Sequence, residues 1–434
     1  MFGQWLLLLG ACVGPWPEVR LSGTIDQDLT LEADRAWLID GVVFVEDATL
    51  TIEPGTTLRG TSSSALVITR SGRIEARGTA TEPIVFTSDQ PTGARAAGDW
   101  GGLVLLGRGV VHEGTGAAEG IDESDARGTY GGQDDQHSCG ALQYVRVEFA
   151  GFFLDRDSDL NGLTLAGCGS GTIVDFVQTH ATLDDGVEVV GGTVDIRHLL
   201  VSYPNGQGLD WSEGWRGNVQ YLIIQHGEPS GSAVEGENND DELDEMPRSA
   251  PTIYNATLLG VNDDGSASRG IILRAGTAGM VRNSIISGFG LESIDIRDRE
   301  TTRAIESGEL EVSHTLLAEI GPRGDGYFDA EDDVETDDDD FDESAWFFDP
   351  KAMNASTSAG VFPNAMVVLQ PDGKQDLTPS DDAFTPAGEG LVANTPAART
   401  PEDRFWDESA NYVGAVRPGA DAAWWTGWTE FPAN

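Results

Sequence analysis

Four carboxylates are the side chains of this sequence whose types and spacing best suit chemistry. Asp184, Asp185 and Glu188 stand close together in ATLDDGVEVVGGTVDIRHLLV (181–201), and Asp210 follows in the next segment of similar pattern. Such a set can hold Ca²⁺, which favours several carboxylate oxygens. Two carboxyls about 5 Å apart also suit a retaining glycosidase, and Ca²⁺ with an arginine base suits a polysaccharide lyase. The simplest alternative is a solvated corner of a repeating coil, partly neutralised by arginines: Arg197, Arg216, Arg269 and Arg274.

Glycines align the segments that carry these carboxylates. Each aligned segment begins with a glycine and then alternates apolar and polar residues: Gly162, Gly186, Gly208 and Gly270. Two positions after these glycines stand Thr164, Glu188, Asp210 and Ile272. Because successive side chains of a strand point to opposite sides, Glu188 and Asp210 should point outward from adjacent coils. Their mutual repulsion then has to be offset by a cation, a shared proton, an arginine or water. They are the candidate catalytic pair.

Short segments with a period of two recur along the chain and predict strands. One group comprises 145–151, 174–180, 194–201, 219–225, 253–260, 281–288 and 312–318, and a second comprises 161–167, 185–192, 207–214, 268–276 and 291–298. Two or three strands per repeat with glycine-rich corners and no helical period predict a solenoid of stacked β-coils. The expected inward residues are Val187, Val189, Leu209, Trp211, Ile271 and Leu273. Asn255 and Asn283 hold equivalent places, where their amides could form a ladder.

Several strings carry a resemblance to known proteins. ATLTIEPGTTLRG (48–60) and LVITRSGRIEARGTATEPIVFTS (66–88) resemble coils of right-handed parallel β-helix proteins. GDWGGLVLLG, CGALQYVRVEFAG, LDDGVEVVGGTV and the tail NYVGAV…WWTGWTEF resemble a family of bacterial surface lipoproteins that is distantly similar to the pectate-lyase-like superfamily. The resemblance spans roughly residues 25–430 and implies an all-β, single-stranded, right-handed parallel β-helix over residues 25–350. It implies no defined chemistry, since fold and function are separate inferences.

The first residues resemble an export signal. MFGQWLLLLGAC has a short apolar run followed by small residues, and Leu9-Gly10-Ala11-Cys12 resembles the bacterial lipobox. That resemblance implies a signal peptide over 1–11, lipidation of Cys12, a tether over 12–24, and an anchor in the outer membrane or cell surface of a bacterium. No lysine or arginine precedes the apolar run, so a plain signal peptide is the alternative.

Two further cysteines fit an exported protein. Cys139 and Cys168 are a candidate disulfide, because disulfides persist outside the reducing cytosol. Two buried free thiols are the alternative interpretation.

The charge is strongly negative. The chain has 434 residues, a formal net charge of -47 and two lysines, Lys351 and Lys374. This surface would repel nucleic acid and anionic lipid headgroups, which excludes both as partners. The acidity either keeps the protein soluble in a salty medium or collects divalent cations. Three segments, 112–137, 228–250 and 321–350, are acidic or glycine-rich and should loop out of the coils.

The last segment, 351–434, should wrap around the β-helix and cap it. Trp424, Trp425 and Trp428 are expected to plug an open end, where strand edges need cover. A sugar-stacking platform is the alternative role of these tryptophans.

Together these features predict an exported, monomeric surface protein with a binding or structural role. Its expected partners are an extracellular polysaccharide or a surface protein, and Ca²⁺ is its expected cofactor. A carbohydrate-active lyase or hydrolase that uses Glu188 and Asp210 is the alternative, although the catalytic signatures of related β-helix enzymes are not recognisable here.

Overall fold

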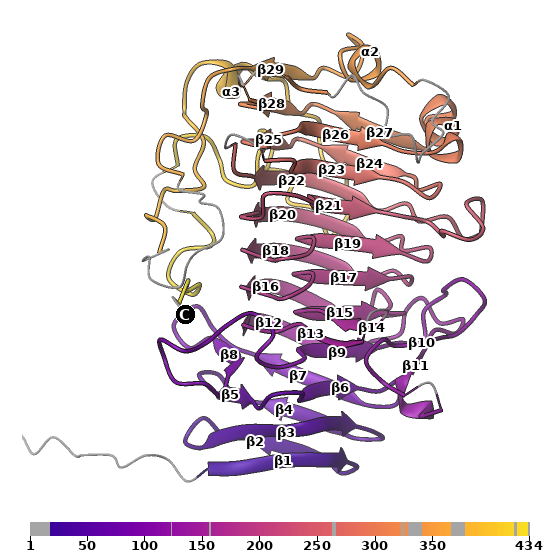
Figure 1. The fold of residues 1–434 in the computed structure, drawn as a ribbon, viewed down its shortest axis with the longest axis vertical. Coiled ribbons are helices and arrows are strands. Elements are labelled where there is room, and N and C mark those ends of the chain that lie inside the picture. Colours follow the sequence, from indigo (N-terminus) through magenta and orange to yellow (C-terminus); the bar gives the residue numbers. More distant parts are fainter. Residues whose placement is uncertain are drawn as a thin grey trace, which may run out of the picture.

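The computed structural model describes residues 18–434 apart from 123, 156–157, 263–265, 323, 325, 329–340, 366–377, 421–422 and 433–434. The chain winds into a parallel β-helix whose coils stack along the long axis of the molecule (Figure 1). Each coil contributes to three faces, and strands of successive coils pair in parallel on each face. The expected fold class, an all-β parallel solenoid, is confirmed.

Face A carries the candidate carboxylates. Its strands are β6 (Ala65–Ile68), β9 (Leu103–Leu106), β15 (Leu163–Ala166), β17 (Val187–Val190), β19 (Leu209–Ser212), β21 (Ser232–Gly236), β23 (Arg269–Leu273) and β26 (Glu292–Ile296). The ends of β1 (Glu18–Ile25) and β3 (Ala36–Val45) extend the same face toward the N-terminus.

Faces B and C complete each coil. Face B contains β2 (Leu29–Leu31), β4 (Thr49–Ile52), β7 (Arg73–Arg77), β24 (Gly279–Arg282) and β27 (Leu310–Ser313). Face C contains β5 (Thr57–Gly60), β8 (Ile84–Ser88), β25 (Ile285–Ser287), β28 (Leu316–Ala318) and β29 (Ala355–Thr357). Long strands bend from face B into face C: β12 (Gly140–Glu148), β16 (Ile173–His180), β18 (Asp195–Ser202), β20 (Asn218–Gln225) and β22 (Thr252–Leu259).

The bend in the long strands falls on residues with positive φ. Tyr144, Phe176, His198 and Tyr221 have φ of 50°, 57°, 50° and 67°. Their rings stack on one another along the axis, with centroid separations of 4.4, 4.1 and 4.8 Å. Asn255 and Asn283 hold the same position in the following coils, with φ of 58° and 55°. Asparagine tolerates this left-handed conformation, and the predicted equivalence of the two asparagines is confirmed.

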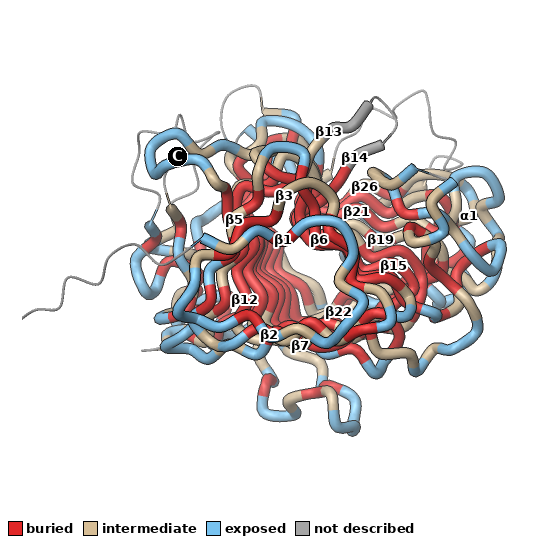
Figure 2. Tube along the Cα trace, turned by 90° about the horizontal axis from the view of Figure 1, so that it is seen from below, coloured by how far each residue is buried: buried red, intermediate tan, exposed pale blue. Residues whose placement is uncertain are grey.

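Apolar side chains that alternate along each strand fill the interior. The predicted inward residues of β17, β19 and β23 are all buried, with at most 1% exposure: Val187, Val189, Leu209, Trp211, Ile271 and Leu273. Seen along the axis, buried segments form continuous stacks around the centre (Figure 2). The single apolar core explains why one period-two pattern suffices to specify every coil.

The N-terminal part begins earlier than expected. β1 starts at Glu18 and pairs in parallel with β3, so residues 18–24 belong to the first coil and not to a tether. Cys12 and the predicted signal peptide lie outside the described residues. Cys139 and Cys168 form the expected disulfide, with sulfurs 2.05 Å apart and Cα atoms 5.9 Å apart. Among the described residues, no helix has the length and apolarity needed to cross a membrane.

All three predicted side loops contain regular structure, and the segment 321–350 includes the helix Glu343–Phe347. The segment 228–250 includes β21, which occupies face A between β19 and β23, so this part does not loop out. The segment 112–137 includes β10 (Gly116–Ala117), η1 (Ala126–Gly128) and β11 (Thr129–Tyr130). A hairpin of β13 (Phe152–Asp155) and β14 (Ser158–Leu160) precedes β15 in the chain.

Two short helices lie near the C-terminal coils. α1 (Arg299–Ser307) is capped by Asp298, which accepts from the Thr301 amide at 2.8 Å, and it ends at Gly308 with φ 79°. α2 (Glu343–Phe347) lies at the C-terminal end of the solenoid (Figure 1). Phe347 is fully buried in the main core, and partly buried aromatic residues pack beside it: Tyr327, Phe328, Phe341 and Trp346. This end is therefore covered by aromatics of the predicted loop 321–350.

The C-terminal segment runs back along the outside of the coils (Figure 1), passing α3 (Leu391–Asn394). Asn283 accepts from the Ala398 amide at 2.7 Å, and Asn255 donates to the Tyr412 carbonyl at 2.7 Å. The predicted outer path of this segment is thus observed, and the two amides bind it, whereas the sequence suggested that they could form a ladder with each other. Further along, Gln178 donates to the Glu430 carbonyl at 2.7 Å.

Candidate functional site

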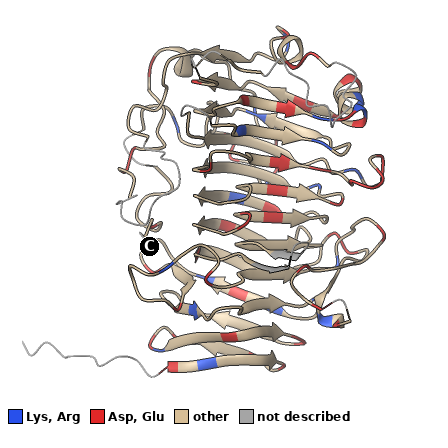
Figure 3. Cartoon of the chain, in the orientation of Figure 1, with Lys and Arg blue, Asp and Glu red and all other residues tan. Residues whose placement is uncertain are grey.

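The candidate carboxylates form a column on the outward side of face A. Thr164 pairs with Glu188, Glu188 with Asp210, and Asp210 with Glu235 in the parallel register of β15, β17, β19 and β21. The glycine alignment correctly placed Glu188 beside Asp210, but it continued to Ile272. Because β21 intervenes, Glu235 is the true neighbour of Asp210. The acidic segments of these successive strands appear in red in Figure 3.

Amide side chains hold these carboxyl groups in place. Asn161 donates to Glu188 Oε2 at 2.8 Å, and its own oxygen accepts from the Asp185 amide at 3.2 Å. Gln207 donates its backbone N–H to Asp185 Oδ1 at 2.6 Å and its side-chain amide to Glu235 Oε2 at 2.6 Å. The two amides thus link the corner between faces C and A to the carboxylate column.

Arginine reaches one end of the column. Arg274 lies 2.6 Å from Glu235 Oε1 and also pairs with Glu237 and, at 2.9 Å, with Asp240. The other arginines expected to neutralise the column are engaged elsewhere: Arg269 with Glu292 and Asp295, Arg216 with Asp135, and Arg197 over the ring of Phe405. The positive charge is therefore concentrated beside Glu235.

Protonation offsets repulsion in the rest of the column. Burial, reinforced by the charges of Glu119, Asp184 and Glu213, raises the pKa of Glu188 to about 8. Burial and neighbouring carboxylates also raise the pKa of Asp210 and of Asp185 well above the ordinary range. At neutral pH the Glu188 carboxyl thus carries a proton and can donate a hydrogen bond. A cation, a proton, an arginine or water could offset the repulsion between these carboxyl groups, and burial favours the proton.

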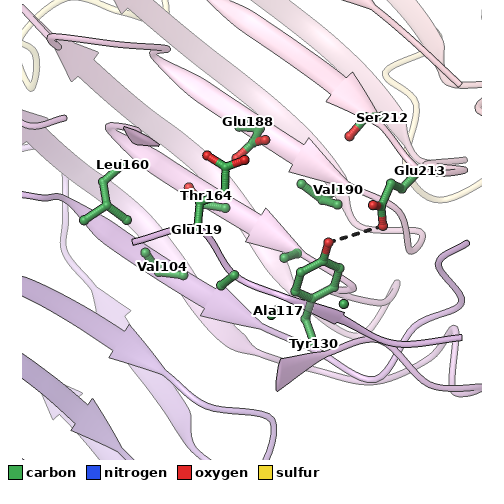
Figure 4. Close-up of a pocket in the computed structure, with 13 residues that line it drawn as sticks. Val104, Ala117, Glu119, Tyr130, Leu160, Thr164, Glu188, Val190, Ser212 and Glu213 are labelled. Carbon is green, nitrogen blue, oxygen red and sulfur yellow. Dashed lines mark hydrogen bonds between the residues drawn. The ribbon is translucent and has the colours of Figure 1, made fainter. Parts of the chain in front are cut away.

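A cavity of about 340 Å³ lies against this column (Figure 4). Its polar wall contains Glu119, Tyr130, Thr164, Glu188, Ser212 and Glu213, and its apolar wall contains Val104, Ala117, Ala118, Leu160, Ala166 and Val190. Tyr130 donates to Glu213 Oε2 at 3.3 Å. Such a mixture of apolar and convergent polar groups is typical of a ligand site.

A second cavity of about 370 Å³ continues from the first. The two share Gly116, Ser212 and Glu213 in their walls. The second is lined by acidic side chains together with His112, Asn238 and Asn239: Glu113, Glu237, Asp240, Asp241, Glu242 and Glu245. We call the two cavities together the face-A cleft.

The predicted calcium ligands do not converge on one point. Asp184 and Asp185 lie at the corner before β17, where a side chain on Gly206 would collide with Oδ1 of both. Glu188 faces the first cavity instead. Within the ranges that the structure describes, no three His, Cys, Asp or Glu side chains are arranged to hold a metal ion. Calcium binding by Asp184, Asp185, Glu188 and Asp210 therefore stays a prediction.

The C-terminal tryptophans lie on the side of the solenoid and not at its end. Trp428 packs edge-on against Tyr144 and Phe176, with centroids 5.8 and 6.0 Å apart, and Trp424 packs on His198 at 5.1 Å. Trp425 and Trp428 are 3% and 1% exposed. The end-plug prediction is wrong because the stacked rings at the bend offer an apolar surface that strand periodicity does not reveal. Burial also leaves Trp425 and Trp428 unable to present a ring face to a sugar.

Sequence reasoning missed several residues of the cleft. Glu235 was hidden because β21 lies inside an acidic stretch, although the alternation in SAVEG (232–236) was a usable signal. Glu119, Tyr130 and Glu213 reach the cleft through the fold of the 112–137 segment and the coil corner after β19. No local pattern marks them.

The sequence profile of one protein family, described as pectate-lyase like beta helix domain, matches residues 23–347. Comparisons with curated proteins and with solved structures gave no match. The matched range runs from β1 to the end of α2 and includes every strand of the face-A cleft. The chain therefore belongs to the pectate-lyase-like beta-helix domain family.

Proposed function

We propose that this is an exported surface protein whose face-A cleft binds an extended, uncharged glycan. The observation that carries the proposal is the pair of adjoining cavities on face A, the first lined by Glu188 and Glu213 and the second by Glu213 and Glu237. Parallel coils repeat at about 4.8 Å, so the cleft offers similar groups at regular intervals to a polymer.

The chemistry of the first cavity suits sugar hydroxyls. A protonated Glu188 can donate a hydrogen bond, whereas Glu213 accepts one from Tyr130 and retains acceptor capacity. Val190 and Leu160 give the cavity an apolar surface against which the C–H groups of a sugar ring can pack. An acidic polymer would be repelled by this wall, which favours a neutral glycan over a polyuronate.

Export and surface attachment are part of the same proposal. The Cys139–Cys168 disulfide supports an oxidising compartment, since structural disulfides are rare in the cytosol. Lipidation of Cys12 would supply the anchor, and mass spectrometry of the mature N-terminus tests it directly.

Glycoside hydrolysis is the second candidate. It is favoured by one observation: Glu188, a carboxyl on the wall of the first cavity that is protonated at neutral pH, has the carboxyl of Asp210 as its neighbour in the next strand. A general acid with a raised pKa next to another carboxyl is the usual composition of a glycosidase site. Incubating the protein with the hexasaccharides named below and measuring newly formed reducing ends separates hydrolysis from binding alone.

The test is calorimetric titration of the Cys12→Ser chain with neutral hexasaccharides: cellohexaose, xylohexaose, mannohexaose and laminarihexaose. We expect at least one hexasaccharide to bind. Ser212 lines both cavities, so the larger side chain of Ser212→Trp should obstruct them and weaken that binding by about tenfold or more. Asn218→Trp on the outward side of face B is the matched control and should bind normally. Equal affinity in all three proteins would place the glycan elsewhere.

A further inference from the structure

The segment between β9 and β12 covers face A on the N-terminal side of the cleft. Val111, Ala118 and Tyr130 from this segment form one apolar cluster with outward side chains of face A. The covered side chains are at most 5% exposed: Phe44, Val67 and Val104. The outward surface of face A is therefore covered in the coils that precede Thr164, and it is open to a ligand in the coils that follow.

Specific contacts fasten this cover to the first coils. The Arg127 guanidinium lies 3.8 Å from the centre of the Phe44 ring and donates to Thr24 Oγ1 at 2.9 Å. Arg70 donates to the Gly131 carbonyl at 3.1 Å. These contacts join the cover to β1, β3 and the turn after β6. The cover is therefore an integral part of the fold.

The cover also forms the wall of the first cavity. Gly116 to Glu119 and Tyr130 line it from one side, and β15, β17 and β19 line it from the other. The hydrogen bond from Tyr130 to Glu213 spans the two walls. A polymer lying in this cavity can continue into the second cavity, but in the opposite direction it meets the packed cover.

We propose that the face-A cleft binds the end of a glycan chain, with the terminal unit seated in the first cavity against Glu188, Thr164 and Tyr130. This inference rests on the proposed function and specifies its mode. A volume of about 340 Å³ is at the small end of ligand pockets, which suits a terminal unit better than a length of polymer. Internal segments would have to displace Ala118 and Tyr130 from the apolar cluster to pass.

Blocked oligosaccharides test the mode of binding. The probes are the hexasaccharide that binds in the titration above, its borohydride-reduced alditol, and its 4-O-benzyl ether at the non-reducing terminal unit. We expect the probe that is blocked at the bound end to lose about tenfold or more in affinity, because a blocked terminal unit no longer fits a closed cavity. Long polymer should then bind in proportion to its number of chain ends and not to its mass.

A variant that fills the first cavity provides a second test of end recognition. Ala117 is exposed on the cover and lines the first cavity, so Ala117→Phe should fill the cavity without disturbing a coil. We expect an unchanged melting temperature and about tenfold weaker binding of the unmodified hexasaccharide. Ala80→Phe, at another exposed alanine, is the control.

The outcomes separate the two proposals. Equal affinity for the free and both blocked probes overturns end recognition while leaving glycan binding in place. Full affinity of Ala117→Phe for the unmodified probe also overturns it. Absence of binding by every hexasaccharide overturns the proposed function and end recognition together.

Discussion

Glu188 illustrates how one side chain acquires its chemistry from its surroundings. Its outward direction follows from strand alternation, but its pKa of about 8 depends on burial and on the charges of Glu119, Asp184 and Glu213. Two of those neighbours come from outside β17 and its coil. The Asn161 amide, from the corner before β15, then fixes the orientation of the carboxyl.

The raised pKa makes stability depend on pH in a defined direction. Between the ordinary value of 4.5 and about 8, the folded state retains a proton on Glu188 that the unfolded chain has lost. The free energy of unfolding must therefore fall as pH rises through this window, by at most about 1.4 kcal/mol per pH unit for this group. Glu188→Gln should make that slope shallower, so the variant gains stability over wild type above about pH 8 and little below pH 4.5. Urea unfolding across this range measures it.

Glu75 is the matched control for this prediction. Burial there is outweighed by hydrogen bonds from Arg73 and Arg77, which lower its pKa. Glu75→Gln should therefore lose stability above the ordinary carboxyl range and lose less as pH falls, the opposite trend. A Glu188→Gln variant destabilised equally at every pH would contradict the protonated state inferred here.

At the scale of elements, the bend between faces B and C joins the coils to the C-terminal segment. Arg146 in β12 donates to the Trp428 carbonyl at 3.2 Å, and Gln178 in β16 binds Glu430. Because the stacked rings of Tyr144 and Phe176 lie beneath Trp428, the segment buries aromatic area that the coils leave open.

Trp428→Ala should destabilise the protein by about 3–5 kcal/mol, the usual loss for a fully buried tryptophan. Trp424→Ala should lose less, because Trp424 is only half-buried. Urea unfolding measures both, and binding of the hexasaccharide should be unchanged in both variants. Loss of glycan binding with normal stability in Trp424→Ala would restore the sugar-platform interpretation for that residue.

Over the whole molecule, the net charge of -47 opposes compaction. Screening should therefore raise the melting temperature steadily as NaCl increases from about 0.1 to about 1 M, where the Debye length shrinks from about 10 to about 3 Å. CaCl₂ at matched ionic strength distinguishes screening from a specific site. Extra stabilisation by Ca²⁺ that disappears in the Glu188→Ala, Asp210→Ala double variant would establish the predicted cation site. If the melting temperature depends on ionic strength equally for both salts, the acidic residues serve solubility and not cation binding.

The amino-acid sequence by itself determined the parallel β-helix, its inward residues and the pairing of Glu188 with Asp210. These depend on a period of two and on glycine corners, which are local properties repeated from coil to coil. Only the tertiary structure decided that Glu235 follows Asp210, that Tyr130 closes the cleft, that the tryptophans cover a side, and that Glu188 is protonated. Each of these depends on which distant segments exclude water from a surface, and that packing leaves no periodic trace in the chain.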